Sequence, residues 1–181
     1  MSIPKKAFLT KGVGVAKEKL TSFEMALRDA RLANFNLVRV SSIFPPYCKC
    51  IPRDQGLKYL SAGQIVHCVL SEAASNEPHR MLAASVGVAI PKREDQYGYL
   101  SEHHAFGTNE RECGDYAEDL AASMLATILG VKFDPDASYD EKKEIWKISN
   151  EIVRTSAITQ SARVDKHGRW TTVLAVAVFI E

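Results

Sequence analysis

The chain contains 181 residues, of which 46% are hydrophobic and 25% are charged, a balance typical of one globular domain with a buried core. Its 23 lysines and arginines nearly cancel its 22 aspartates and glutamates, so no basic surface for nucleic acid is expected. The first residues lack the apolar core of a signal peptide, and no apolar run approaches the ~20 residues that span a bilayer. We therefore expect a cytoplasmic chain that has no membrane partner.

Apolar patterns predict a series of strands and helices. In chain order, the first expected elements are a strand running into a glycine-bearing loop at 6–16, a helix at 23–32, and strands at 36–40, 64–70, 82–90 and 97–104. Thr21 or Ser22 would cap the first helix, because a hydroxyl residue precedes its apolar stripe. The sequence Gly12-Val13-Gly14 lacks the third glycine of a dinucleotide-binding loop, so it is weak support for a phosphate site.

The second half of the chain predicts a long helix and a closing hairpin. Four large apolar residues recur at four-residue steps within 110–129 and would line the buried face of that helix: Tyr116, Leu120, Met124 and Ile128. Gly130 is expected to end the helix. Residues 134–147 are polar and predict a loop with a short helix, and 151–163 with 170–180 predict a hairpin. Strands interrupted by two or three helices indicate a single layered α+β domain over residues 1–181.

The four cysteines show no spacing that predicts a disulfide framework. Cys48 and Cys50 could form a metal clip with the more distant His67-Cys68 pair. A lone C-x-C sequence lacks the paired spacing of structural zinc sites, however. Cys68 also lies in an apolar strand pattern, where a small buried thiol is common. The sequence therefore favours a chain without a metal site.

The most informative segment is Asn36–Pro46, with the sequence NLVRVSSIFPP. It ends a predicted strand with two adjacent serines and continues into a Pro-Pro turn. Two consecutive serines alone most often belong to a surface turn. A serine pair under backbone strain at a strand end can instead cut the chain, since strained geometry collects at functional sites.

This segment resembles the self-cleavage site of pyruvoyl-dependent arginine decarboxylases. Two later segments, AASVGVAIPK at 83–92 and YGYLSE at 97–102, resemble strands of that family in order and spacing. The resemblance extends over nearly the whole chain. It implies a four-layer α-β-β-α sandwich of mainly antiparallel sheets, assembled as a homotrimer with its active sites between subunits.

The resemblance also implies a cofactor made from the chain itself. The Ser42 hydroxyl would attack the carbonyl carbon of Ser41, and the peptide would rearrange to an ester. Elimination across Ser42 would break that ester and leave a dehydroalanine, which hydrolyses to a pyruvoyl group at position 42. The products would be a β chain, 1–41, and an α chain, 42–181. A ketone on the chain can form a Schiff base with an amine and accept the electrons that decarboxylation releases. The implied activity is decarboxylation of L-arginine to agmatine and carbon dioxide.

The resemblance implies roles for three further residues. Glu102 would protonate the α-carbon after carbon dioxide leaves. Asn36, from the same protomer as the pyruvoyl group, would polarise a carbonyl near the serine pair. Glu24, where the family usually has an aspartate, would bind the substrate guanidinium from a neighbouring subunit. From residue type alone, Asn36 could equally form a strand-end hydrogen bond, Glu102 an exposed charge, and Glu24 a favourable acid in the first turn of a helix. The adjacent His103 and His104 receive no role.

Two other functions stay open at this point. The same cofactor could act on another amino acid such as histidine or aspartate, although an acidic pocket disfavours aspartate. The chain could alternatively remain uncleaved and serve as a structural or binding subunit. Ser41, Ser42 and Glu102 are all present, which speaks against this last reading.

Overall fold

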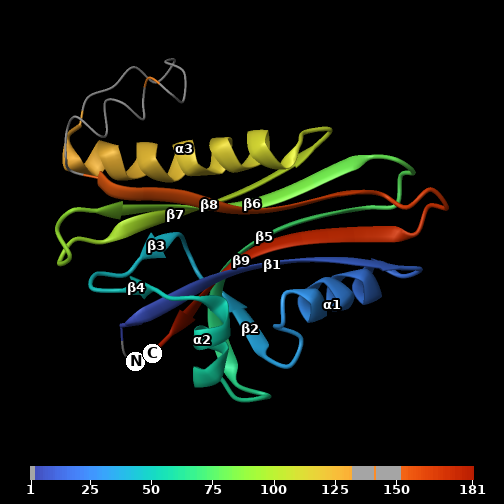
Figure 1. Cartoon of the computed structure of the whole chain (residues 1–181), viewed down its shortest axis with the longest axis horizontal. Coiled ribbons are helices and arrows are strands. Elements are labelled where there is room, and N and C mark those ends of the chain that lie inside the picture. The colour runs from blue at the N-terminus through green and yellow to red at the C-terminus, as the bar shows by residue number, and fades with distance from the viewer. Residues whose placement is uncertain (1–2, 132–140, 142–151) are drawn as a thin grey trace.

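The computed structural model describes residues 3–131, 141 and 152–181. Two sheets pack face to face, with α1 and α2 beside one sheet and α3 across the outer face of the other (Figure 1). This is the layered α+β domain that the sequence pattern predicts, in the sandwich form that the resemblance implies. In chain order the elements are β1 (Lys6–Ala16), α1 (Lys19–Asp29), β2 (Asn36–Arg39), β3 (Ile43–Phe44), β4 (Lys49–Cys50), α2 (Arg53–Gly56), the 3₁₀ turn η1 (Leu57–Tyr59), β5 (Ile65–Ser75), β6 (Met81–Pro91), β7 (Gly98–Phe106), α3 (Glu110–Leu129), β8 (Ile152–Arg163) and β9 (Trp170–Ile180).

The first sheet has the strand order β2-β5-β9-β1-β4. Its centre is antiparallel, with Val176 of β9 opposite Thr10 of β1 on one side and Leu70 of β5 on the other. The short strands β2 and β4 pair in parallel at the two edges. Every residue of β9 from Thr171 to Ile180 is buried, because layers cover both faces of this central strand.

The second sheet has the strand order β3-β7-β6-β8 and is antiparallel throughout. Along β6 the side chains alternate between two cores, as the two-residue period of a strand requires. Val86 and Val88 face the first sheet, whereas Ala89 faces α3. A Cβ on Gly87 would lie 2.1 Å from the backbone oxygen of Ala117, so glycine permits the close approach of α3.

The closing hairpin predicted from the sequence is wrong, because its two strands belong to different sheets. β8 pairs with β6 in the second sheet, whereas β9 lies between β5 and β1 in the first. The turn after β8 therefore carries the chain from one layer to the other (Figure 1). A short turn between two apolar strands signals proximity and leaves open whether the strands share hydrogen bonds.

The glycine-bearing loop and the helix cap predicted near the N-terminus are also wrong. β1 continues through Gly12 and Gly14, where a Cβ would lie 2.2 Å from the Ala26 oxygen and 2.1 Å from the Ser22 oxygen, respectively. These glycines let α1 lie directly on the strand. α1 begins at Lys19, and no side chain caps it. Ser22 is buried within the helix, with its hydroxyl 2.7 Å from that of Thr172.

The bounds predicted for the long helix are confirmed, but its predicted core face is wrong. Asn109 caps α3 by accepting a hydrogen bond from the Glu112 N–H at 2.9 Å, and Gly130 ends it with φ 69°. The buried residues of α3 are mostly small: Cys113, Gly114, Ala117, Ala121, Ala122, Leu125 and Ala126. Tyr116 and Ile128 are 52% and 42% exposed. The polar segment predicted at 134–147 lies almost wholly outside the described residues.

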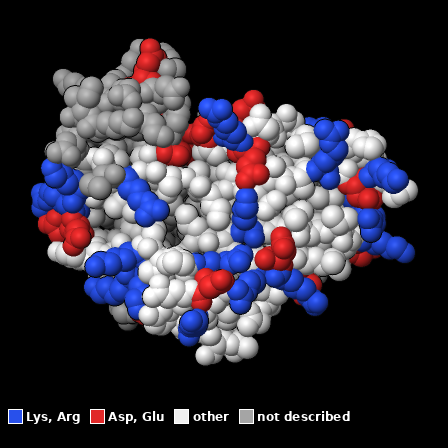
Figure 2. Space-filling model, viewed as in Figure 1, with Lys and Arg blue, Asp and Glu red and all other residues white. Residues whose placement is uncertain are grey.

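Charged side chains of both signs are interspersed on the face shown in Figure 2. None of the helices in the described part of the chain combines the length and apolar character needed to traverse a bilayer.

Candidate active site

The serine pair lies where the chain crosses from one sheet to the other. The Val40 N–H, just after β2, donates to the Cys68 oxygen on β5 at 2.9 Å. Two residues later the backbone carbonyl oxygen of Ser42 accepts a hydrogen bond of 2.8 Å from the Leu100 N–H on β7. The Ser41–Ser42 peptide is thus held at both ends by strands of different sheets. Such a crossing fixes the position of this bond tightly.

The structure brings Ser42 and Glu102 together, as the resemblance implies. β7 carries Leu100 and Glu102 on the face turned toward the first sheet, and β3 pairs with β7 through Ile43 opposite Tyr99. The Ser42 hydroxyl donates to Oε2 of Glu102 at 3.4 Å. This is a long hydrogen bond between two groups that can exchange a proton. Ser42 is half-buried and Glu102 is exposed, so both remain accessible to a small molecule.

The structure keeps Asn36 away from Ser42 within one chain. Asn36 begins β2, and its side-chain amide donates to the Gly63 oxygen at 2.8 Å. From Asn36 to Val40 the extended chain covers about 13 Å. Within one chain the amide therefore forms the strand-end hydrogen bond that its residue type also predicts.

Glu24 likewise lies apart from Ser42 in the same chain. It belongs to α1, which packs on the outer face of the first sheet, whereas Ser42 lies beside the second sheet (Figure 1). Oε1 of Glu24 accepts a hydrogen bond from Nε of Arg28 at 2.6 Å. The carboxylate therefore already binds a guanidinium, the group that the substrate arginine would present.

Sequence reasoning missed two backbone groups at the site. The Leu100 N–H binds the Ser42 oxygen, and the Ile43 N–H donates to the Ser41 oxygen at 3.0 Å. Every residue except proline carries such a donor, so residue type gives no signal for either one. Only the pairing of β3 with β7 could have revealed the Leu100 contact.

His103, next to Glu102, is half-buried and points toward α3. Its ring lies 4.3 Å from that of Tyr116, and its backbone oxygen accepts a hydrogen bond from the Ser71 hydroxyl at 2.7 Å. Burial, with a smaller contribution from His104, lowers the pKa of His103. The ring contact joins β7 to α3, and the hydrogen bond joins β7 to β5, both at the residue next to Glu102.

The cysteines are free, and their surroundings favour the thiol form. Burial, with a smaller contribution from Cys50, raises the pKa of Cys48 to about 12. Burial raises the pKa of Cys68 to about 11. In the described ranges, no three His, Cys, Asp or Glu side chains gather in a way that could hold a metal ion.

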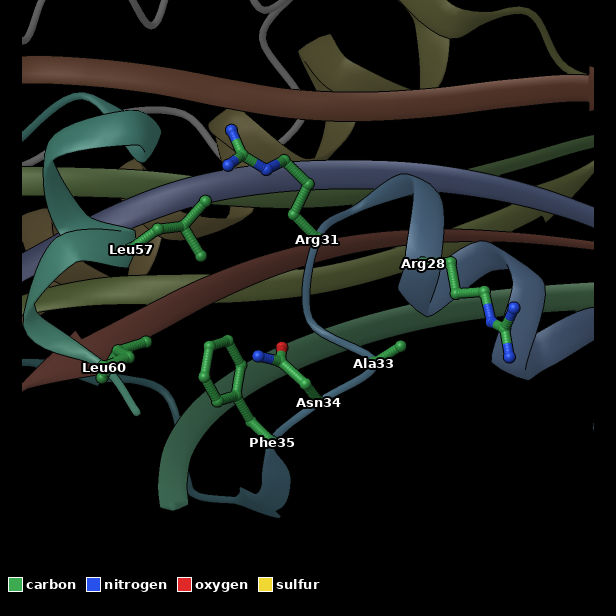
Figure 3. A pocket seen from close by; sticks show the side chains of 7 residues that line it. All are labelled: Arg28, Arg31, Ala33, Asn34, Phe35, Leu57 and Leu60. Carbon is green, nitrogen blue, oxygen red and sulfur yellow. The ribbon is translucent and has the colours of Figure 1, made fainter. Parts of the chain in front are cut away.

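An open pocket of about 390 Å³ lies at the C-terminal end of α1, beside η1 (Figure 3). The side chains of Arg28 and Arg31 point away from each other in this view. Each pairs with a carboxylate, Arg28 with Glu24 and Arg31 with Asp54 at 2.7 Å. Neither Ser42 nor Glu102 lines this pocket, so it is separate from the serine pair.

Comparisons with known proteins give the family of this chain. The sequence model of the family described as "Pyruvoyl-dependent arginine decarboxylase" matches residues 6–181. The chain belongs to this family. It is 56% identical to the pyruvoyl-dependent arginine decarboxylase of Nitrosopumilus maritimus and 54% identical to pyruvoyl-dependent arginine decarboxylase 2 of Methanosarcina mazei. Each match spans 178 residues and covers 98% of this chain and 97% of the relative.

The residues at the serine pair fit the covalent pyruvoyl group of the pyruvoyl-dependent arginine decarboxylase family. Ser42 supplies the three carbon atoms of such a group, and its hydroxyl already contacts a carboxylate. The Leu100 N–H binds the oxygen that would become the amide carbonyl next to the ketone. That hydrogen bond polarises the carbonyl in the direction that favours uptake of electrons.

Proposed function

We propose that this chain decarboxylates L-arginine to agmatine and carbon dioxide after cutting itself between Ser41 and Ser42. The observation that carries the proposal is the Ser42 hydroxyl bound to Glu102 where the chain crosses between the sheets. The names of the relatives from Nitrosopumilus maritimus and Methanosarcina mazei support arginine as the substrate.

Glu102 has a role in the cut itself. Its carboxylate would take the proton of the Ser42 hydroxyl, which turns a weak nucleophile into a stronger one. The oxygen then attacks the Ser41 carbonyl carbon, and the peptide bond rearranges to an ester. Elimination at Ser42 breaks the ester and releases the fragments 1–41 and 42–181, the second of which has 181 − 41 = 140 residues. The dehydroalanine left at position 42 then takes up water and loses ammonia, which gives the pyruvoyl group.

In turnover the pyruvoyl group supplies a ketone electrophile and an electron sink. Glu102 would hold the proton that replaces the lost carboxylate on the α-carbon of the substrate. The Leu100 N–H would keep the carbonyl of residue 42 fixed on β7. The Glu102 carboxylate and the Leu100 N–H both belong to β7. A single strand would therefore align the proton donor with residue 42, and the reaction depends on that alignment.

Glu24 and Asn36 enter the proposal through a homotrimer. Because both lie far from Ser42 in their own chain, each would reach it from a neighbouring subunit. Glu24 would there exchange Arg28 for the guanidinium of the substrate, since a carboxylate accepts either one. Asn36 would use its amide as a donor to a carbonyl of the site.

The decisive experiment follows cleavage and activity in the purified protein. Intact mass and denaturing electrophoresis should show fragments 1–41 and 42–181, with the larger one blocked at its N-terminus. The protein should release agmatine and carbon dioxide from arginine. Ser42→Ala should give one full-length, inactive species.

Two results would contradict the proposal. A wild-type chain that stays full-length after long incubation would indicate a structural or binding subunit. Equal or better turnover of another amino acid in a substrate panel would overturn arginine as the substrate while leaving the self-cleavage intact.

A further inference from the structure

The carbonyl that is to be attacked already has a hydrogen-bond donor. The Ile43 N–H donates to the Ser41 oxygen at 3.0 Å, a bond from residue i+2 to residue i. Such a bond defines a γ-turn, here with Ser42 at its centre. The chain thus folds back on itself at the one peptide bond that the proposed cleavage breaks.

The strand pairing explains why the Ile43 N–H is available for this contact. β3 and β7 are antiparallel, and Ser42 is bonded to β7 through the Leu100 N–H. Successive residues of a strand direct their backbone groups to opposite edges. Ile43, one residue later, therefore turns its N–H away from β7. The γ-turn gives that donor a partner, the Ser41 oxygen.

We propose that the Ile43 backbone N–H is the oxyanion donor of self-cleavage, which adds a catalytic group to the reaction proposed above and rests on that proposal. A donor held about 3 Å from a carbonyl oxygen before reaction gains strength as negative charge develops there. Ile43 provides this donor from within the cleaved segment, whereas the amide of Asn36 in the same chain is bound to Gly63.

The chemical step is balanced as follows. The hydroxyl oxygen of Ser42 forms a bond to the carbonyl carbon of Ser41 as the hydroxyl proton passes to the Glu102 carboxylate. The π electrons of the carbonyl move to the Ser41 oxygen, where the Ile43 N–H binds the new negative charge. When the carbonyl re-forms, the bond from Ser41 carbon to Ser42 nitrogen breaks, and the nitrogen takes the proton from Glu102. The ester that results has the same atoms as the original peptide.

The test removes this single donor and leaves the side chain unchanged. Isoleucine at position 43 is replaced by its α-hydroxy acid, so that an ester oxygen stands where the N–H was. The full-length chain is made by cell-free translation, and the appearance of fragment 42–181 is followed by intact mass. Mass also separates cleavage after Ser41 from hydrolysis of the introduced ester. We expect cleavage to slow by about 100-fold, the usual effect of losing one oxyanion donor.

Two controls separate catalysis from folding. The α-hydroxy acid of tyrosine at position 47 removes another backbone donor of the same loop, the N–H that binds the Glu94 oxygen at 2.8 Å. It should cleave at close to the wild-type rate. Ile43→Val keeps the donor and should also cleave normally. Ile43→Pro removes the donor by ordinary mutagenesis and should also slow cleavage. It serves as the test if the ester variant folds poorly.

The outcomes distinguish this inference from the proposed function. If the wild-type chain never cleaves, the proposed function fails. If the wild-type chain cleaves and the ester and proline variants cleave within twofold of it, the Ile43 N–H is not the oxyanion donor, and only this inference is overturned. Equal slowing of the position 43 and position 47 esters would likewise overturn it, because loop disruption would then explain both.

Discussion

Arg31 has a backbone conformation that few side chains tolerate. Its φ is 63°, in the left-handed region, just after the C-cap Ala30 of α1. The Leu32 N–H donates to the Leu27 oxygen at 2.8 Å, which completes a helix-ending motif that usually has glycine at this position. The arginine side chain pairs with Asp54 of α2, so a favourable contact accompanies the unfavourable backbone.

Replacing Arg31 should therefore separate these two effects. Arg31→Ala loses the ion pair but keeps the strained φ, and exposed pairs contribute only about 0–1 kcal/mol. Arg31→Gly loses the same pair and relieves a strain of about 1 kcal/mol. We expect the glycine variant to unfold at higher urea concentration than the alanine variant. Equal midpoints would show that the left-handed conformation carries no cost at this residue.

Glu102 should be required for both cleavage and turnover. Glu102→Gln keeps the shape of the side chain but cannot accept the Ser42 proton, and such proton transfer contributes about 10²–10⁴-fold. We expect slow appearance of fragment 42–181 and little agmatine from the fraction that does cleave. Glu77→Gln, which changes another exposed carboxylate on the turn before β6, should behave as wild type. Normal turnover by cleaved Glu102→Gln protein would remove this residue from the mechanism.

At the scale of elements, α3 buries mostly small residues, with Leu125 as the large exception, and exposes the large side chains of Tyr116 and Ile128. Leu125 is fully buried, whereas Ile128, three residues later, is 42% exposed. The close approach of α3 to Gly87 explains the arrangement, because bulky side chains would hold the helix away from β6.

Truncating these two residues should reveal which face carries the packing energy. Leu125→Ala should lower the free energy of unfolding by about 2–5 kcal/mol, as for other buried leucines. Ile128→Ala should lower it by no more than about 1 kcal/mol, since half-exposed side chains lose little on truncation. Chemical denaturation of the two variants gives the comparison. The reverse order would mean that the outer face of α3 packs against a further layer in solution.

Most elements could be predicted from the sequence, because their apolar patterns are long and regular. The 20 residues of α3 and its end at Gly130 follow directly from the amphipathic pattern. The inward face of α3 could not be predicted, since hydrophobicity favours Tyr116 and Ile128 while only the distance to β6 selects alanine and glycine. The division of β8 and β9 between two sheets depends on long-range pairing, which local pattern does not encode.

At the site, too, some features could be predicted from the sequence and others could not. Ser42 and Glu102 could be singled out because a hydroxyl and a carboxylate suit the proposed chemistry and lie in segments that resemble a known family. The contacts of Ile43 and Leu100 come from the backbone and follow only from the register of β3 on β7. The distance between Glu24 and Ser42 within one chain likewise depends on which sheet each residue lies beside.

At the scale of the whole molecule, the site should be complete only when subunits associate. In the proposed trimer, Ser42 of one subunit works with Glu24 of a neighbour. The purified protein should therefore sediment with three times the mass of one cleaved protomer. A stable, active monomer would contradict the shared site.

Mixing two inactive variants should restore activity if the site is shared. Glu24→Gln supplies an intact Ser42, and Ser42→Ala supplies an intact Glu24. In trimers formed by co-expression, about one quarter of the interfaces should combine the two intact residues. Arginine decarboxylation should recover accordingly, whereas co-expression of Glu24→Gln with the doubly substituted chain should stay inactive. No recovery in verified mixed trimers would place both residues in one subunit.

The partition of strands between the two fragments also bears on how the mature protein could recover from damage. Every residue of β1 has a partner on β9, and β2 pairs with β5, so the 41-residue piece would form one flank and one interior strand of the larger piece's sheet. Once the chain is cut, unfolding would release two separate polypeptides. Renaturation would then become bimolecular, and dilution alone could make denaturation permanent.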